Sequence, residues 1–410
     1  MKNILIWGTG QKGQDAFKKL SQYTDAYNIV AFGDNDIHKI GTIFYGKPIW
    51  GSSMLKQKEK IDGIFIASSA SKEIREQLEK MVTIPVYDDI DYLILPRMSI
   101  DISGFCNGKC KWCVTGRKNR KGQGIKVEQY MHYDFFVRLY EHLISKSVIV
   151  PDTEIMLYSW GEPLLNPDYI KIIEYLAENR QIFSVSTNAS VAPMTEKAGT
   201  YRGCTAFTFS MPGFSQQSYD RIHQLSFEKV KENIKRIVDN IYSHGFQGDG
   251  SLSWHVYKFN MHEMTAAREF AESLNLRFDA YYPYFNGLKL TQKYLEGQLA
   301  DEKDDIESDF FFNHVERLLK QRPEEYECYF NKVISIDYKG RFVLCCVSDD
   351  ECADYVWEPV MSVNDLWTLR KQMLQSDTCK MCRKLHVDYW MLKNPRFVND
   401  SCDTKYGDIK

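Results

Sequence analysis

Three cysteines lie close together in the stretch Cys106-Asn-Gly-Lys-Cys110-Lys-Trp-Cys113, directly after the apolar run Met98–Ile102. Gly108 loosens this stretch, so three thiolates can converge on one metal centre. Four cysteines would close a four-iron cluster completely, whereas three leave one iron open to bind another molecule. A zinc site is the alternative, but no fourth Cys or His follows within the loop. The pattern therefore favours an iron–sulfur cluster with one open coordination site.

The spacing Cys-x3-Cys-x2-Cys, with an aromatic residue before the last Cys, resembles the signature of the radical S-adenosylmethionine (SAM) superfamily. The resemblance implies a [4Fe–4S] cluster on Cys106, Cys110 and Cys113 whose open iron binds SAM through its amino and carboxylate groups. Reductive cleavage of SAM would then give a 5′-deoxyadenosyl radical, which abstracts a hydrogen atom from the substrate. The resemblance also implies that Trp112 packs near the SAM adenine, although a loop tryptophan equally often packs simply to bury area.

A second motif ends the next expected strand. Ser159-Trp160-Gly161-Glu162-Pro163 resembles the Gly-Gly-Glu-Pro motif of the superfamily, with Trp160 in place of the first glycine. By this resemblance Gly161 and Glu162 receive the SAM ammonium group, and a carboxylate suits a cation. The alternative interpretation is a plain turn before a helix.

Polar residues at later strand ends extend the resemblance, which covers roughly residues 97–290. Ser186, Asn188 and Ser210 resemble the polar cluster that contacts the ribose of SAM. Asn260 and Glu263 follow the fifth strand, where the superfamily often carries SAM contacts, but the glycine-rich form of that motif is absent here. The cofactor-binding residues expected by resemblance are thus Trp112, Gly161, Glu162, Ser186, Asn188 and Ser210.

A second group of cysteines lies near the C-terminus: Cys328, Cys345, Cys379 and Cys382. Four thiolates close a cluster completely, and they also suit zinc. The order of one cysteine, a hairpin-like stretch ending in Gly-x4-Cys, and a CxxC pair resembles the auxiliary-cluster domain called SPASM, or its shorter twitch form. The resemblance implies an auxiliary [4Fe–4S] cluster. A full SPASM domain would place a further Cys where this chain has Asp388, so we expect one auxiliary cluster rather than two.

The N-terminus carries a glycine turn after the apolar run Ile4 to Trp7. Gly8, Gly10 and Gly13 open a helical stretch, and Asp34 follows the second apolar run. This arrangement is typical of a Rossmann-like nucleotide site, in which the glycines admit a phosphate to the helix N-terminus and the carboxylate binds a ribose. The sequence around Asp34 resembles the N-terminal domain of bacterial sugar acyltransferases, which implies a UDP-sugar ligand. A scaffold that binds nothing is the alternative.

Alternation of apolar strands with amphipathic helices predicts an α/β chain of three domains. Residues 1–95 would form the Rossmann-like domain, 96–320 a partial (β/α)6 barrel of radical SAM type, and 321–410 a small iron–sulfur domain. The acidic stretch Asp301–Asp309 is expected to be a solvated loop or helix face that ends the barrel. The six barrel strands are predicted at Met98–Ile102, Glu154–Ser159, Ile182–Ser186, Ala206–Ser210, Ser253–Tyr257 and Arg277–Tyr282.

Composition indicates a globular, cytoplasmic protein. The net charge of −3 gives no electrostatic reason to expect a nucleic-acid or membrane partner, and no apolar run approaches the roughly 18 residues that span a bilayer. In a reducing compartment, clustered cysteines more often bind metal than form disulfides. The remaining cysteines are expected to be small buried hydrophobic residues: Cys204, Cys346, Cys352 and Cys402.

These features together predict a radical SAM oxidoreductase or epimerase that acts on a sugar or a nucleotide-linked sugar. An electron donor of the flavodoxin or ferredoxin type would reduce the cluster, and the auxiliary cluster would take an electron from the substrate or orient it. Two alternatives remain open: a peptide-modifying radical SAM enzyme, and a non-catalytic iron–sulfur protein. The sequence names no catalytic residue and no substrate carbon.

Overall fold

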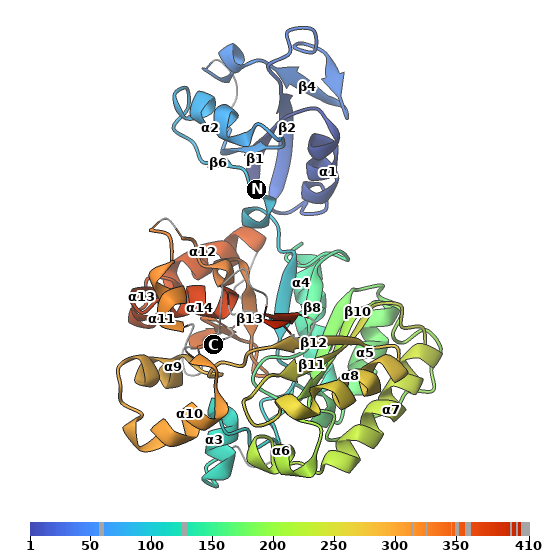
Figure 1. Cartoon of the computed structure of the whole chain (residues 1–410). Coiled ribbons are helices and arrows are strands. Elements are labelled where there is room, and N and C mark those ends of the chain that lie inside the picture. Colours follow the sequence, from blue (N-terminus) through green and yellow to red (C-terminus); the bar gives the residue numbers. More distant parts are fainter. Residues whose placement is uncertain are drawn as a thin grey trace. The chain divides into compact units, whose positions relative to one another are not determined.

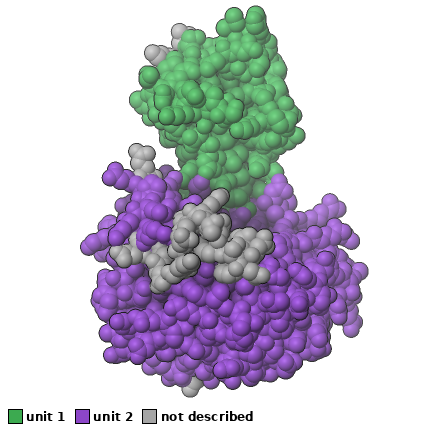
Figure 2. Space-filling model, viewed as in Figure 1, with its two compact units in different colours: residues 1–96, 140–150, 358–369 green, residues 97–139, 151–357, 370–410 purple. Residues whose placement is uncertain are grey.

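The computed structural model describes residues 1–56, 61–124, 129–312, 315–324, 326–345, 347–348, 352–356, 362–393, 396–398 and 401–402. The chain divides into two compact units, shown in different colours in Figure 2. Unit 1 comprises residues 1–96, 140–150 and 358–369, and unit 2 comprises the rest. No helix among the described residues is both long and apolar enough to cross a membrane.

Unit 1 is built on a sheet with the strand order β3-β4-β2-β1-β5-β6 (Figure 1). Its central strands β1, β2 and β5 are parallel, and the inner residues of β1 and β5 are buried, as expected for strands covered on both faces. The glycine turn follows β1 and leads directly into α1. The elements are β1 (Lys2–Trp7), α1 (Gln11–Leu20), β2 (Tyr27–Gly33), β3 (Ile43–Phe44), β4 (Lys47–Trp50), β5 (Gly63–Ile66), α2 (Ser71–Glu79) and β6 (Val86–Tyr87).

Unit 2 contains the six parallel strands of the predicted partial barrel, in the order β7-β8-β9-β10-β11-β12. Each predicted barrel strand is present, with bounds that differ by a few residues: β7 (Arg97–Ile100), β8 (Glu154–Met156), β9 (Phe183–Thr187), β10 (Cys204–Met211), β11 (Asp249–His255) and β12 (Arg277–Tyr281). The helices between them are α3 (Val114–Arg120), α4 (Tyr133–Ser145), α5 (Tyr169–Glu178), α6 (Gln216–Arg221), α7 (Phe227–Ser243) and α8 (Met264–Ser273). The predicted α/β partial barrel is confirmed.

The C-terminal segment joins the barrel sheet at both edges. β13 (Ile334–Ile336) pairs in parallel with β7 and forms a hairpin with β14 (Arg341–Val343), while β16 (Arg396–Val398) pairs with β12. Gly340, at φ +79°, makes the hairpin turn that the sequence predicts before Cys345. The other elements of this segment are α9 (Leu288–Leu295), α10 (Lys303–Asp309), α11 (Val315–Lys320), β15 (Cys352–Val356), α12 (Val363–Met373), α13 (Asp377–Lys384), α14 (Val387–Lys393) and β17 (Ser401–Cys402).

Candidate active site

The three-cysteine loop connects β7 to α3, and all three of its cysteines line the same cavity. A Cβ atom added at Gly108 would lie 3.3 Å from the Sγ of Cys110 and 3.5 Å from the Sγ of Cys106. The Nδ2 of Asn119 fixes the loop backbone by donating to the carbonyls of Cys106 and Gly108, both at 2.7 Å. Cys113 is the N-cap of α3, and its amide donates to the carbonyl of Cys110 at 3.3 Å.

Burial makes the thiols of Cys106 and Cys110 poor acids on their own. It raises the pKa of Cys106 to about 12, and burial together with the neighbouring thiols raises the pKa of Cys110. Three adjacent thiolates therefore need a positive centre, which the irons of a cluster would supply. The donor set fits a [4Fe–4S] cluster held by Cys106, Cys110 and Cys113. Among the described residues, no group of three His, Cys, Asp or Glu side chains is arranged around a single metal ion.

Two buried carboxylates fix the loop that follows β8. The Oδ2 of Asp101, after β7, accepts hydrogen bonds from the amides of Trp160 (2.8 Å) and Gly161 (3.2 Å). The carboxylate of Glu162 accepts from the hydroxyl of Thr187 (2.6 Å) and the amide of Asn188 (2.7 Å). Burial raises the pKa of both acids to about 7, against the effect of these hydrogen bonds. A nearby cation would stabilise the charged form of such a buried carboxyl group.

Asn188 links the end of β9 to the cysteine loop. Its Nδ2 donates to the Oδ1 of Asn107 at 3.2 Å and lies 3.8 Å from the Sγ of Cys106, a distance that suits a weak hydrogen bond to sulfur. The residue predicted to contact the SAM ribose thus also lies beside a predicted cluster ligand.

All nine predicted cluster and SAM residues of unit 2 line one open cavity of about 1040 Å³. The structure therefore brings them together; their individual roles stay predictions.

Sequence reasoning missed several polar residues in the same cavity. His255 and Tyr281 stand at strand ends, where the same signal that found Ser210 applies. His223 and Asn286 lie in loops, which carry no such signal. The missed polar residues include His223, His255, Tyr257, Tyr281 and Asn286.

The two histidines are neutral at physiological pH because they are buried. Burial, with smaller effects of His255 and Arg120, lowers the pKa of His223 to about 3. Burial also lowers the pKa of His255 to about 4. The ring centroids of the pair lie 6.4 Å apart, and the Nδ1 of His223 has no hydrogen-bond partner among the described residues. The pair therefore offers uncharged hydrogen-bonding groups to the cavity.

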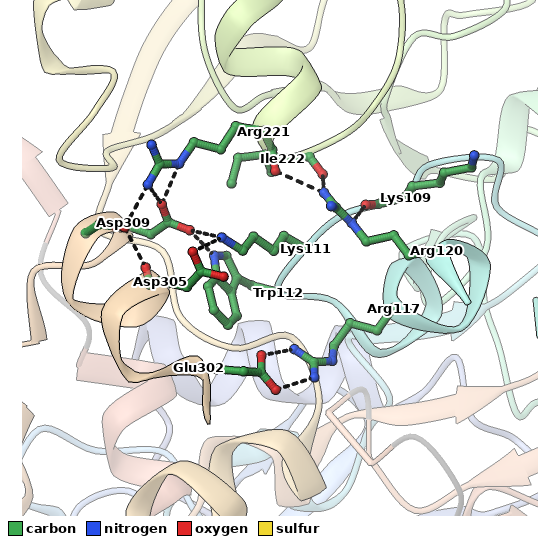
Figure 3. A network of polar contacts seen from close by, with 11 residues as sticks. Lys109, Lys111, Trp112, Arg117, Arg120, Arg221, Ile222, Glu302, Asp305 and Asp309 are labelled. Atoms are coloured by element: carbon green, nitrogen blue, oxygen red, sulfur yellow. Dashed lines mark hydrogen bonds and ion pairs between the residues drawn. The ribbon is translucent and has the colours of Figure 1, made fainter. Parts of the chain in front are cut away.

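Trp112 is held from outside the barrel by Asp309, the last residue of α10 (Figure 3). The Nε1 of Trp112 donates to the Oδ2 of Asp309 at 2.8 Å, and Arg221 binds the other carboxylate oxygen at 2.7 Å. Lys111 adds an ion pair to Asp309 at 3.2 Å. The prediction of a solvated acidic stretch is wrong at Asp309, which is fully buried because it neutralises these cations. Trp112 both lines the cavity and packs in an aromatic core, so packing and adenine contact are compatible.

Asn260 and Glu263 do not line the cavity. The Nδ2 of Asn260 donates to the carbonyls of Pro212 and His255, and its Oδ1 accepts from the amide of Tyr257. Glu263 accepts hydrogen bonds from the amide of Phe214 and from serine hydroxyls near α6. Both side chains fix turns in this structure, which gives no support to SAM contacts by them.

The C-terminal cysteines surround a second pocket, of about 440 Å³. Cys379 and Cys382 lie one turn apart on α13, so their side chains share a face. Burial raises the pKa of Cys328 to about 12, and the neighbouring thiol of Cys345 adds to this shift. Burial also raises the pKa of Cys379 and Cys382, and four thiols around one pocket fit the full set of ligands for a cluster. The four predicted ligands all line this pocket: Cys328, Cys345, Cys379 and Cys382.

Of the four remaining cysteines, Cys204 is buried, as predicted. Cys346 lies outside the described residues, and nothing is described of the side chains of Cys352 and Cys402.

The predicted nucleotide residues of unit 1 lie at the ends of β1 and β2. Gly8, at φ +126°, packs against the carbonyl of Ala67, and a Cβ at Gly13 would meet the carbonyl of Gly8 at 2.1 Å. Gly10, the N-cap of α1, faces open space. The carboxylate of Asp34 accepts hydrogen bonds from Thr9, Lys39 and the amide of Asp36. These contacts keep its pKa below the ordinary value although burial alone would raise it.

Comparison with protein families matches both parts of this description. Residues 100–252 match the radical SAM superfamily, and residues 1–88 match the family described as C2185-like, N-terminal. The strands β8 to β10 of the partial barrel thus lie in the segment that matches the radical SAM superfamily, and a segment before them matches the C2185-like N-terminal family.

Curated relatives match only the barrel region. A GTP 3′,8-cyclase of Pasteurella multocida (strain Pm70) is 24% identical over 146 residues, which are 35% of this chain and 41% of that protein. A GTP 3′,8-cyclase of Edwardsiella ictaluri (strain 93-146) is 22% identical over 151 residues, 36% of this chain and 43% of that protein. The match spans about two-fifths of the length of these relatives.

Solved structures with a similar chain path include SuiB of Streptococcus suis bound to precursor peptide SuiA. It is 12% identical, with a TM-score of 0.46, and the match covers 74% of this chain and 71% of that chain. BtrN in complex with AdoMet and 2-DOIA is 13% identical, with a TM-score of 0.34, over 73% of this chain and 90% of that chain.

Proposed function

We propose that the chain is a radical SAM enzyme that cleaves SAM reductively and abstracts a hydrogen atom from a sugar or nucleotide-linked sugar, giving oxidation or epimerisation. The observation that carries this proposal is the cavity of unit 2, where the cysteine loop and the ends of β8, β9 and β10 meet. When bound there, the cluster and SAM supply a 5′-deoxyadenosyl radical. The residues of the chain bind and orient SAM and the substrate around it.

SAM would be held by the groups next to the cysteine loop. Glu162 and the backbone of Gly161 suit the SAM ammonium, because a buried carboxylate and a nearby carbonyl both favour a cation. Ser186, Asn188 and Ser210 offer hydroxyl and amide groups to the ribose.

The remaining wall of the cavity suits a substrate rich in hydroxyl groups. Apart from Glu162 and the cysteines, the residues that line it carry no acidic side chain and no Lys or Arg. The histidines are neutral, and burial raises the pKa of Tyr281 to about 12, so its hydroxyl stays protonated. Neutral donors and acceptors beside aromatic rings are typical of sites that orient an uncharged polar ligand.

Unit 1 would hold the nucleotide of such a substrate. Helix α1 begins at Gln11, its N-cap Gly10 has no side chain to cap it, and its first turn holds no acidic residue, so its first amides are available to a phosphate. The open space at Gly10 fits the close approach of a ligand. The resemblance to sugar acyltransferases favours a UDP-sugar.

Reductive SAM cleavage tests the proposal. Anaerobically reconstituted protein with dithionite or reduced flavodoxin should form 5′-deoxyadenosine, and Cys110→Ala should not. Two four-iron clusters predict about eight irons per chain, and replacing Cys106, Cys110 and Cys113 together by Ala should leave about half. Nucleotide sugars should stimulate SAM cleavage. Stimulation by peptides alone would replace the sugar substrate with a peptide, and no 5′-deoxyadenosine with any substrate would count against catalysis.

A further inference from the structure

The four-cysteine pocket contains a buried arginine that is incompletely paired. Arg370 of α12 is only 4% exposed and lines the pocket. Its Nη2 donates to the carbonyl of Phe330 at 2.5 Å, and its Nε to the carbonyl of Asn331 at 3.4 Å. Its Nη1 is buried and has no hydrogen-bond partner among the described residues. A buried donor of this kind is costly unless a further acceptor occupies the pocket.

The carboxylate that lines the same pocket is already paired with another arginine. Asp388 lines the same pocket, but it forms an ion pair with Arg322 at 3.1 Å, and both side chains are at least nine-tenths buried. Arg383 adds a second cation to the pocket wall, where its Nη2 donates to the carbonyl of Leu374 at 3.2 Å. The charged side chains that line this pocket are thus Arg370, Arg383 and Asp388. Because Arg322 neutralises Asp388, the two arginines make the pocket suit an anion.

A four-iron cluster with four thiolate ligands is such an anion, with a net charge of about −2 when oxidised and one more negative charge when reduced. Hydrogen bonds to its sulfurs and nearby cations stabilise the reduced form most, because that form carries the larger charge. Phe330 lies two residues after Cys328, so its bond to Arg370 holds the guanidinium beside this ligand.

We propose that Arg370 donates a hydrogen bond from its Nη1 to a sulfur of the auxiliary cluster and thereby raises the reduction potential of that cluster. The proposal rests on the auxiliary cluster of the proposed function and deepens it. A cluster that accepts an electron readily suits a net oxidation of the substrate better than a redox-neutral epimerisation.

The test uses full-length protein in which Cys106, Cys110 and Cys113 are Ala, so that only the auxiliary site can hold a cluster. Its midpoint potential is measured by an anaerobic redox titration followed by electron paramagnetic resonance. Arg370→Gln should lower the midpoint and change the signal of the reduced cluster. Arg370→Lys, which keeps the charge but loses the planar fork, should give an intermediate midpoint. Lys371→Gln is the matched control on the exposed side of the same helix and should leave the midpoint unchanged.

The outcomes separate this inference from the function on which it rests. A parent protein that binds zinc or no iron overturns both the auxiliary cluster and the role of Arg370. Iron retained with the same midpoint in Arg370→Gln overturns the role of Arg370 alone. If Arg370→Gln loses its iron, the Arg370→Lys titration decides: a midpoint equal to that of the parent overturns the proposal.

Discussion

At the scale of single residues, the cysteine loop depends on a carboxylate far along the chain. Asp309 is fully buried and binds Trp112, Lys111 and Arg221. Asp309→Asn would leave two cations beside a neutral amide. We expect it to lower the free energy of unfolding by about 3–5 kcal/mol and to speed the release of iron to a chelator. Urea denaturation and chelator kinetics measure the two effects.

Glu302→Gln is the control for Asp309→Asn. Glu302 forms a bidentate pair with Arg117 at 2.6 and 2.7 Å, but both side chains are partly exposed to solvent. An ion pair in contact with water contributes at most about 1 kcal/mol. Equal losses in the two variants would contradict the role assigned to Asp309.

His223 gives the folded chain a pH dependence of known sign. Its pKa is about 3 in the folded chain and 6.5 without burial. Between these values the unfolded chain binds a proton that the folded chain does not, so stability falls as pH drops from 6.5 toward 3. His223→Gln should reduce the slope of the unfolding free energy between pH 6 and pH 4 by about 1.4 kcal/mol per pH unit. Unfolding titrations at several pH values measure the slope, and an unchanged slope would show that His223 is protonated when folded.

At the scale of elements, the loops at the strand ends pack backbone against backbone. A Cβ at Gly161 would lie 1.4 Å from the carbonyl oxygen of Ser103, which follows β7. Gly161→Ala must therefore move the loop that carries Glu162. We expect SAM affinity to fall by roughly tenfold or more, or about 1.4 kcal/mol, with the iron content unchanged. Equilibrium dialysis with labelled SAM measures the affinity; a normal affinity would mean that this loop does not bind SAM.

The barrel elements were predictable because they are local. Each strand is a short apolar run, and the carboxyl ends of parallel strands meet at one edge, so the polar residues after them share a cavity. His223 and Asn286 escaped prediction because backbone contacts with the cysteine loop place them. The amide of Lys109 donates to the carbonyl of His223, and Asn286 exchanges backbone bonds with Trp112 and Val114. Pairing of this kind leaves no pattern in the sequence.

The C-terminal segment also contains backbone pairing that the sequence does not predict. The hairpin of β13 and β14 was predicted from its glycine and cysteine spacing. The parallel pairing of β13 with β7, in which Ile334 lies opposite Met98, could not be predicted. The sequence of a three-residue strand does not indicate which strand it pairs with. Likewise, the acidic composition of residues 301–309 concealed the buried Asp309.

At the scale of the whole molecule, we expect each unit to bind its own ligands independently of the other. Gly10→Trp fills the open space at the start of α1, so we expect UDP or UDP-sugar binding to fall at least roughly a hundredfold, or about 2.7 kcal/mol. Both clusters should keep their iron, because their cysteines belong to unit 2. Asp34→Ala should weaken binding less, since its carboxylate already binds Thr9 and Lys39.

Calorimetry with UDP, UDP-sugars, dTDP-sugars, NAD and CoA measures this binding. Tight binding of NAD without UDP would contradict the proposal that unit 1 holds the nucleotide of the substrate. Binding of none of these ligands would favour a scaffold that binds nothing. The division into three domains at residues 95 and 320 stays a prediction.

The pairing of β7 with β13 has a consequence for how the chain is made. At about 5–20 residues per second, β7 leaves the ribosome roughly 10 to 50 s before β13. During that interval the outer edge of β7 offers unpaired amides and carbonyls to any other strand that it meets. Asp309 also emerges long after Trp112, so the hydrogen bond between them, which holds the cysteine loop, cannot form until then. We therefore expect the nascent barrel to be prone to aggregation until synthesis is nearly complete, and a cluster on the cysteine loop to be assembled after translation.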